Sequence, residues 1–247
     1  MNFFDLITNK NVAIVGPAAY MNHSGLGSKI DSHDTVVRIN RSIETTNTHF
    51  VDVGRRTDIL YSCLIEKSAN AGKLNGEELR DHYGIKFICA PPKSSMTGVA
   101  HQTILHDMVD INNVRRIAEM VPIRIVDHEF HTALALKVKC RPNTGFLALY
   151  DLLRFKPAKL SVYGFSFYLD GFMPKCKEGI EKEISLTEKE FVDKCFNSQR
   201  HNQKNMWRYA KETLTNNQLV NLDETLTTIL ALTSLDRNLF KESLSND

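Results

Sequence analysis

His201 is the residue whose type and position point most directly to acid–base chemistry. It stands in the segment Arg200–Gln203, just before a helix predicted over Lys204–Leu214. The unperturbed pKa of an imidazole lies near neutrality, so a histidine at the mouth of a helix can act as a general base. A surface or capping histidine fits the same position, and both interpretations stay open at the level of this residue.

A second segment has the residue types of an anion-binding site. The run Arg141–Gly145 reads RPNTG and leads into an apolar helix predicted over Thr144–Phe155. Asn143 or Thr144 can cap this helix, and Gly145 lets the backbone approach a ligand. The free N–H groups of a helix N-terminus suit a phosphate. A well-capped helix without a ligand is the alternative.

The stretch from Val12 to Asn40 joins an apolar strand, a glycine-containing loop and a second apolar strand. It is not a dinucleotide fingerprint, because Gly25–Gly27 begins nine residues after Gly16 instead of directly after the strand. It is not a P-loop either, because Gly27–Lys29 inverts the Gly-Lys-Ser/Thr order. The polar Asn40, at the end of an apolar strand, favours a ligand site over a plain connection.

The sequence argues against a metal centre. Asp127–His131 contains two histidines but lacks the helical spacing of zinc-protease motifs, and no cysteine lies near it. The absence of any Asp-x-Asp pair argues against holding a diphosphate through a metal ion. Five widely spaced cysteines, never in a Cys-x-x-Cys pair, favour free thiols in a reducing compartment.

These candidate residues must be positioned by an α/β sheet. Apolar runs, several of them apolar on both faces, alternate with helical segments, which predicts a doubly wound and mostly parallel sheet. The predicted strands are Val12–Gly16, Thr35–Ile39, Asp58–Cys63, Ile85–Ala90, Ile123–Val126 and Leu160–Phe165. Further helices are predicted over Gly76–His82, Ala100–Met120 and, in two pieces, from Asp223 onward. Ligands bind at the carboxyl ends of the strands in such sheets, where Gly16, Asn40 and Phe165 stand.

The amino-acid composition is that of a globular protein. Of its 247 residues 42% are hydrophobic and 24% charged, and no shift in composition divides the chain, so we expect one domain over residues 1–247. A net charge of +2 with only short basic pairs gives no support for a nucleic-acid partner. No apolar run approaches the roughly 18 residues of a membrane span, and no signal peptide is recognisable. We expect a cytoplasmic protein, which leaves peripheral association with a membrane open.

Together these segments resemble glycosyltransferase family 29, the sialyltransferases of animals and their relatives. The first stretch is similar to the large sialyl motif, and the RPNTG segment with the following strand is similar to the small one. His201 falls where the last motif of the family has its histidine. The matching residues are Val15-Gly16, Ser24–Gly27, Ile30–Asp34, Val37–Asn40, Val53–Thr57, Pro142–Gly145 and Val162–Phe165.

The resemblance implies a GT-A-like, Rossmann-type sheet of about seven strands that binds a CMP-activated sugar acid without a metal or another cofactor. It also implies a glycan acceptor, with His201 as the general base for inverting transfer. The donor-binding positions that it implies are Gly16, Pro17, Asn40, Asn143, Thr144, Gly145 and, in the loop after the last strand, Tyr168.

The chain departs from the family pattern at four places. Pro17 replaces an asparagine and cannot donate a hydrogen bond, and Met206 stands where the last motif has a glutamate. No His-Tyr pair follows Phe165, so a phosphate contact from that loop falls to Tyr168. Val12 and the Phe155–Pro157 region stand in place of a disulfide, which fits a cytoplasmic microbial or viral relative.

Several functions remain open at this stage. The donated sugar could be sialic acid, Kdo or another ulosonic acid. The missing glutamate and His-Tyr pair motivate a non-catalytic nucleotide-sugar-binding relative as a second hypothesis. A third is another nucleotide-dependent α/β enzyme, such as a methyltransferase. Such an enzyme would need an acidic residue at the end of the second strand to hold a ribose, and the chain has Asn40 there with Glu44 four residues on.

Overall fold

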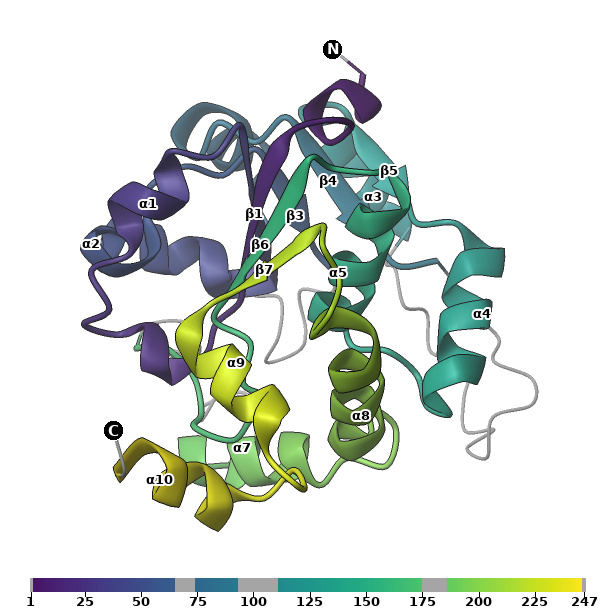
Figure 1. Ribbon diagram of the computed structural model, residues 1–247. Coiled ribbons are helices and arrows are strands. Elements are labelled where there is room, and N and C mark those ends of the chain that lie inside the picture. The colour runs from purple at the N-terminus through teal and green to yellow at the C-terminus, as the bar shows by residue number, and fades with distance from the viewer. Residues whose placement is uncertain (1, 65–73, 93–110, 175–185, 246–247) are drawn as a thin grey trace.

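The computed structural model describes residues 2–64, 74–92, 111–174 and 186–245, and its centre is one seven-stranded sheet (Figure 1). All strand pairs are parallel, and the strand order is β5-β4-β3-β2-β1-β6-β7. The predicted α/β class and sheet are thereby confirmed. The strands are β1 Asn11–Val15, β2 Thr35–Ile39, β3 Ile59–Tyr61, β4 Phe87–Ala90, β5 Ile123–Ile125, β6 Lys159–Tyr163 and β7 Val220–Leu222.

Of the helices near the candidate residues, α5 begins at the predicted residue, and α8 begins one residue before its predicted start. The helices of the described chain are α1 Gly27–Asp31, α2 Phe50–Val53, α3 Ile111–Ala118, α4 His128–Val138, α5 Thr144–Arg154, α7 Glu188–Phe196, α8 Gln203–Leu214, α9 Glu224–Ala231 and α10 Arg237–Ser245. Short 3-10 helices cover Phe4–Leu6, Ala19–Met21 and Asn40–Asn47, and a π-helix covers Glu78–His82. Most of the helix predicted over Ala100–Met120 lies outside the described residues, and α3 occupies the remainder.

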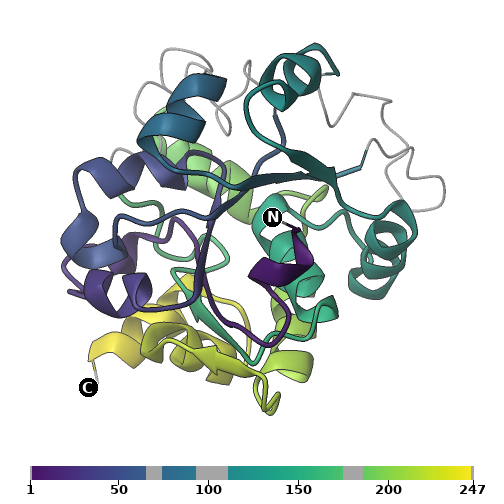
Figure 2. The same ribbon diagram turned by 90° about the horizontal axis from the view of Figure 1, so that it is seen from above.

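The sheet lies between two layers of helices (Figures 1 and 2). Alternate residues of β1 point to opposite layers, as the period of a strand requires. Val12 and Ile14 belong to the core shared with α4, α5, α8 and α9. Ala13 and Val15 belong to the core shared with α1, α2 and α7. Because β1 is buried on both sides, its nearly continuous apolar sequence follows from its central place.

The carboxyl ends of β1 and β6 are joined by a close contact between two glycines. Val15 pairs with Tyr163, and Gly16 N–H donates to the Tyr163 carbonyl at 2.8 Å. A Cβ on Gly16 would lie 2.3 Å from the Gly164 carbonyl oxygen, and Gly164 itself has φ 71°. A side chain at either position would push the two loops apart.

In the residues that the structure describes, no helix combines the length and apolar character needed to cross a membrane.

Candidate functional site

A cleft of about 390 Å³ opens at the carboxyl ends of β1, β2 and β6, where parallel sheets bind ligands. It brings together segments that are far apart in the chain: the loop after β1, the end of β2, the start of α5, the loop after β6, and the α7–α8 region. Seven of the eight predicted site residues line it: Pro17, Asn40, Asn143, Thr144, Gly145, Tyr168 and His201.

Gly16, the eighth predicted residue, is absent from the described lining. Its N–H is bound to Tyr163, and the Gly164 backbone occupies the space beside its Cα. The structure therefore gives Gly16 a packing role under the cleft. Pro17 does line the cleft, and its carbonyl accepts a hydrogen bond from Met173 N–H at 2.8 Å.

One end of the Asn40 side-chain amide forms a hydrogen bond within the protein. The residue adopts φ 47°, a left-handed conformation that asparagine tolerates better than most residues. Its Oδ1 accepts a hydrogen bond from Cys63 N–H at 3.1 Å, which links the ends of β2 and β3. The Nδ2 donor has no partner among the described residues, so it is available to a ligand in the cleft.

The start of α5 has the same arrangement. Asn143 caps the helix, with Oδ1 accepting from Phe146 N–H at 2.8 Å. The N–H groups of Thr144 and Gly145 lack a partner within the described chain, as expected in a first helical turn. A Cβ on Gly145 would lie 3.2 Å from the Phe165 ring, so glycine lets the β6 loop pack closely here. This helix end presents free donors and a partial positive charge to the cleft.

His201 is held as a neutral imidazole by a backbone carbonyl. Its Nδ1 lies 2.8 Å from the Arg141 carbonyl oxygen, so Nδ1–H donates there and the Nε2 lone pair stays available. Burial, reinforced by the nearby Arg200 and His131, lowers the pKa of His201 from 6.5 to about 4. Met206 lies fully buried in the core. The orienting partner of His201 is thus a carbonyl from a segment about 60 residues earlier, which no sequence pattern reports.

The loop after β6 is anchored by a buried tyrosine and an aspartate that sequence reasoning missed. Tyr20 Oη donates to Asp223 Oδ2 at 2.7 Å and accepts from Phe165 N–H at 3.0 Å. Asp223 Oδ2 also accepts from Gly164 N–H at 2.9 Å. Burial raises the pKa of both Tyr20 and Asp223. Two later loop residues, Phe167 and Tyr168, adopt positive φ, so the anchor holds a conformationally costly turn in the cleft wall.

The Ile30–Asp34 run, a strong match in the sequence, builds the scaffold rather than the cleft lining. Asp31 accepts hydrogen bonds from the N–H groups of Arg55 and Arg56, at 2.8 and 3.0 Å. Arg38 is fully buried and donates to backbone carbonyls at the end of α2 and just after it, including Val53 O at 2.6 Å. Burial lowers the pKa of Arg38 to about 10. None of these four residues belongs to the described lining.

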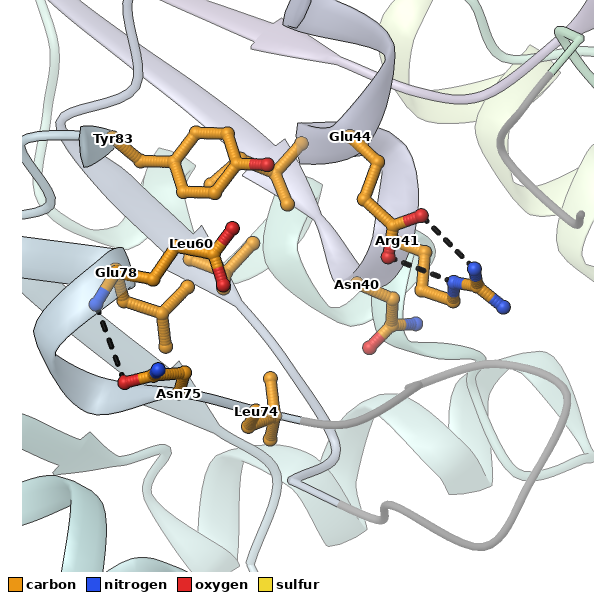
Figure 3. A pocket seen from close by; sticks show the side chains of 10 residues that line it. Asn40, Arg41, Glu44, Leu60, Leu74, Asn75, Glu78 and Tyr83 are labelled. Carbon is orange, nitrogen blue, oxygen red and sulfur yellow. Dashed lines mark hydrogen bonds and ion pairs between the residues drawn. The ribbon is translucent and has the colours of Figure 1, made fainter.

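The charged side chains that line the cleft are all cationic in the described structure: Arg41, Arg141, Lys194 and Arg200. Arg41 is paired with Glu44 at 2.9 Å. Figure 3 shows this pair beside a second pocket, of about 110 Å³, that shares Asn40 and Arg41 with the cleft and is also lined by Glu78. The two carboxylates therefore lie on the side of the smaller pocket.

Within the described ranges, no group of three or more histidine, cysteine or acidic side chains is arranged to hold a metal ion. Asp127 instead caps α4, accepting from Phe130 N–H at 2.7 Å, and His131 is buried within that helix. The four described cysteines, Cys63, Cys89, Cys140 and Cys195, are thiols that form no disulfide. Where the family disulfide would lie, backbone hydrogen bonds join the two segments, with Asn9 N–H donating to Lys156 O at 3.1 Å.

Comparison with solved structures finds sialyltransferases. The sialyltransferase CstII from Campylobacter jejuni, in complex with the substrate analogue CMP-3FNeuAc, has a TM-score of 0.50 and 11% identity, covering 86% of this chain and 78% of its own. A mammalian sialyltransferase has a TM-score of 0.48 and 17% identity, covering 86% of this chain and 68% of its own. At such identities the likeness concerns the fold. A search of curated proteins by sequence found no match.

The family comparison covers most of the chain. The model of glycosyltransferase family 29 (sialyltransferase) matches residues 7–170, which include β1 to β6, α5 and the turn through Tyr168. The helices α7 and α8, with His201 between them, follow the matched segment. The match confirms the resemblance to both sialyl motifs: the chain belongs to glycosyltransferase family 29, and its enzyme class is that of a sialyltransferase-like glycosyltransferase.

Proposed function

We propose that this protein transfers sialic acid, or a related ulosonic acid such as Kdo, from a CMP donor to a glycan hydroxyl, with His201 as general base. The observation that carries the proposal is the assembly of Asn40, the start of α5 and His201 around one cleft. Family membership supports the reaction class. In this proposal the reaction uses neither a metal nor another cofactor, and the protein works in the cytoplasm.

The donor phosphate is assigned to the N-terminus of α5. The N–H groups of Thr144 and Gly145, and Asn40 Nδ2, are donors without partners in the described structure, and they suit phosphate oxygens. Arg141, just before the helix, adds a cationic side chain. As CMP leaves, its phosphate gains a negative charge, which preorganised donors of this kind stabilise.

The transfer step balances with the groups present. His201 Nε2 removes the proton from the acceptor hydroxyl while the hydroxyl oxygen forms a bond to the anomeric carbon of the sugar acid. The bond from that carbon to the phosphate oxygen breaks, and its electron pair leaves with CMP. Attack opposite the leaving group inverts the anomeric configuration. The imidazolium then returns its proton to solvent.

The assignment of His201 is tested by replacing it with asparagine and measuring CMP release from CMP-sialic acid and CMP-Kdo with acceptor. We expect His201→Asn to lower kcat by about 10²- to 10⁴-fold, the usual contribution of a general base, with little change in CMP affinity. His128→Asn, an exposed histidine outside the cleft lining, is the control. The kcat/KM of the wild type should fall as the pH is lowered, with an apparent pKa near 4 instead of 6.5.

Distinct outcomes separate the alternatives. Unchanged turnover in His201→Asn would contradict the general-base role. CMP binding without release in the wild type would favour a non-catalytic nucleotide-sugar-binding protein, and no response to CMP would reject both. Chelation with EDTA should leave the wild-type rate unchanged, and loss of activity restored by a divalent cation would reject metal independence.

A further inference from the structure

The positive charge lining the cleft exceeds what a CMP-sugar donor uses. A CMP-activated sugar acid carries one phosphodiester and one carboxylate. On the donor side the cleft has the N-terminus of α5 and Arg141, and Arg41 is already paired with Glu44. Lys194 and Arg200 remain, and both line the cleft where α7 and the turn before α8 border it; the Arg200 carbonyl accepts a hydrogen bond from Arg141 N–H at 3.1 Å. We propose that these two side chains bind the acceptor, and that the acceptor is a glycan carrying a carboxylate or phosphate close to the accepting hydroxyl.

This inference rests on the proposed function and specifies its acceptor. Lys194 lies on α7, and Arg200 lies in the turn between α7 and α8, directly before His201. Both side chains are exposed, and the described residues provide neither with an ion-pair partner. An anion bound by Arg200 is therefore held beside the base that must deprotonate the acceptor.

Two carboxylates of α7 have partners away from the cleft. Asp193, adjacent to Lys194, pairs with Arg237 of α10. Glu190 accepts from the N–H and hydroxyl of Thr187, each at 2.8 Å, at the start of the helix. No carboxylate among the described residues lines the cleft wall, so an anionic acceptor meets no like charge there.

The cleft also has aromatic side chains that suit a sugar. Phe165, Phe167 and Tyr168 line it and are partly exposed, whereas Phe172 and Phe191 are buried in the lining, with Phe172 centred 5.3 Å from the Tyr168 ring and 5.8 Å from the Phe191 ring. Aromatic rings pack against the apolar faces of sugars and provide large contact areas. Because exposed cations alone contribute little to binding, the adjoining apolar surface matters: it excludes water from the charge contacts. The combination indicates an acidic glycan rather than a free inorganic anion.

The test compares three acceptors that share a galactose: lactose, sialyllactose and lactose phosphate, assayed by CMP release near pH 8. Each acidic acceptor adds at least one charge-assisted hydrogen bond, so kcat/KM for the preferred one should exceed that for lactose by about tenfold or more. Comparing sialyllactose with lactose phosphate shows whether the acidic group of the preferred acceptor is a carboxylate or a phosphate. Added salt should reduce the preference.

Variants of Lys194 and Arg200 test whether these two side chains cause the preference for an acidic acceptor. Lys194→Met and Arg200→Gln should raise KM for the acidic acceptor by about tenfold, and leave KM for lactose and the affinity for CMP unchanged. The matched controls are Lys189→Met, on the same helix, and Arg208→Gln on α8, both exposed and outside the lining. They should leave the acceptor preference unchanged.

Two results would overturn the inference. One is a kcat/KM for lactose equal to that for the acidic acceptors, and the other is a preference for an acidic acceptor that persists in both Lys194→Met and Arg200→Gln. Turnover with lactose would still support the proposed function. If no acceptor gives turnover, calorimetric titration of the CMP-loaded protein with sialyllactose, lactose phosphate and lactose decides the acceptor inference. Binding that fails to favour either acid over lactose rejects it.

Discussion

Two asparagines in the cleft use one end of their amide for folding and present the other to a ligand. Asn40 Oδ1 accepts from Cys63 N–H, and Asn143 Oδ1 accepts from Phe146 N–H. In both residues Nδ2 has no partner in the described structure. An aspartate could accept the same backbone bond, but its second oxygen would face a bound phosphate and repel it. Asparagine therefore satisfies the fold and an anionic ligand together.

Replacing Asn143 with aspartate separates these two roles. Aspartate is as good a helix cap as asparagine, so we expect the thermal midpoint of Asn143→Asp to change little. Affinity for CMP should fall by about tenfold or more, because a carboxylate replaces a hydrogen-bond donor at the phosphate position. Isothermal titration with CMP measures the loss.

Asn217→Asp is the matched control for this change. Asn217 Oδ1 also accepts a backbone hydrogen bond, from Leu219 N–H at 3.0 Å, but the residue is outside the cleft lining. It should bind CMP like the wild type. Equal CMP affinity in Asn143→Asp and the wild type would place the phosphate elsewhere.

At the residue scale, the sequence predicted correctly most of the positions that line the cleft, but it predicted less well what each residue does there. Asn40, Thr144 and Gly145 stand at element ends, which the chain pattern marks. The packing role of Gly16 and the Arg141 carbonyl that holds His201 depend on which loops meet across the sheet. Such contacts form between segments with no common sequence signal, so they could not be predicted.

At the scale of elements, the loop after β6 depends on Tyr20 and Asp223, which lie on either side of it in the chain. Tyr20→Phe removes the donor to Asp223 and the acceptor for Phe165 N–H. We expect unfolding to become easier by about 1–3 kcal/mol, the cost of unsatisfied buried groups. Hydrogen exchange at Phe165 should accelerate and CMP affinity should fall, because the wall carrying Phe165 and Tyr168 loosens.

Tyr83→Phe is the control for this prediction, since within the described residues its hydroxyl accepts one exposed hydrogen bond, from Asn47 at 3.0 Å, and Tyr83 is not in the cleft lining. It should leave CMP affinity unchanged. If Tyr20→Phe has the same hydrogen-exchange rate at Phe165 and the same CMP affinity as the wild type, the Tyr20–Asp223 hydrogen bond is not needed to hold the loop after β6.

The elements themselves were predicted unevenly. Six of the seven strands fall on predicted apolar runs, because strands buried on both faces have nearly continuous apolar sequences. The edge strand β7 has three residues, with Asn221 at its centre, and gives no such signal. The helix α4 was also missed: the segment Asp127–His131 was considered only as a metal site and rejected as one, and its role in starting a helix capped by Asp127 was not recognised.

At the scale of the whole molecule, His131 connects stability to pH. It is fully buried in α4, and neither ring nitrogen has a hydrogen-bond partner among the residues that the structure describes. Burial, with a contribution from His128, lowers its pKa from 6.5 to about 4. Between these values the unfolded chain binds a proton that the folded chain does not. Stability is therefore full above pH 6.5 and decreases as the pH falls toward 4.

Replacing His131 with leucine should weaken this dependence. At neutral pH the free energy of unfolding should rise by about 1 kcal/mol, because two unsatisfied nitrogens leave the core. The loss between pH 6.5 and 4 should become smaller, with the remaining loss due in part to His201. Denaturant titrations across this range measure both effects. The control His23→Asn, at an exposed histidine in a left-handed conformation that asparagine tolerates, should follow the wild type, and identical pH profiles for His131→Leu and wild type would contradict the linkage.

The parallel topology also dictates the order in which the protein can form during its synthesis. Val12 of β1 pairs with Leu160 of β6, so 148 residues separate the partners (160 − 12). At a translation rate of roughly 5–20 residues per second, β1 waits roughly 7 to 30 s for this neighbour. Meanwhile one edge of β1, with its unpaired backbone N–H and C=O groups, stays open to other chains. The nascent polypeptide should therefore need chaperones most in that interval, before the last third of the chain has emerged.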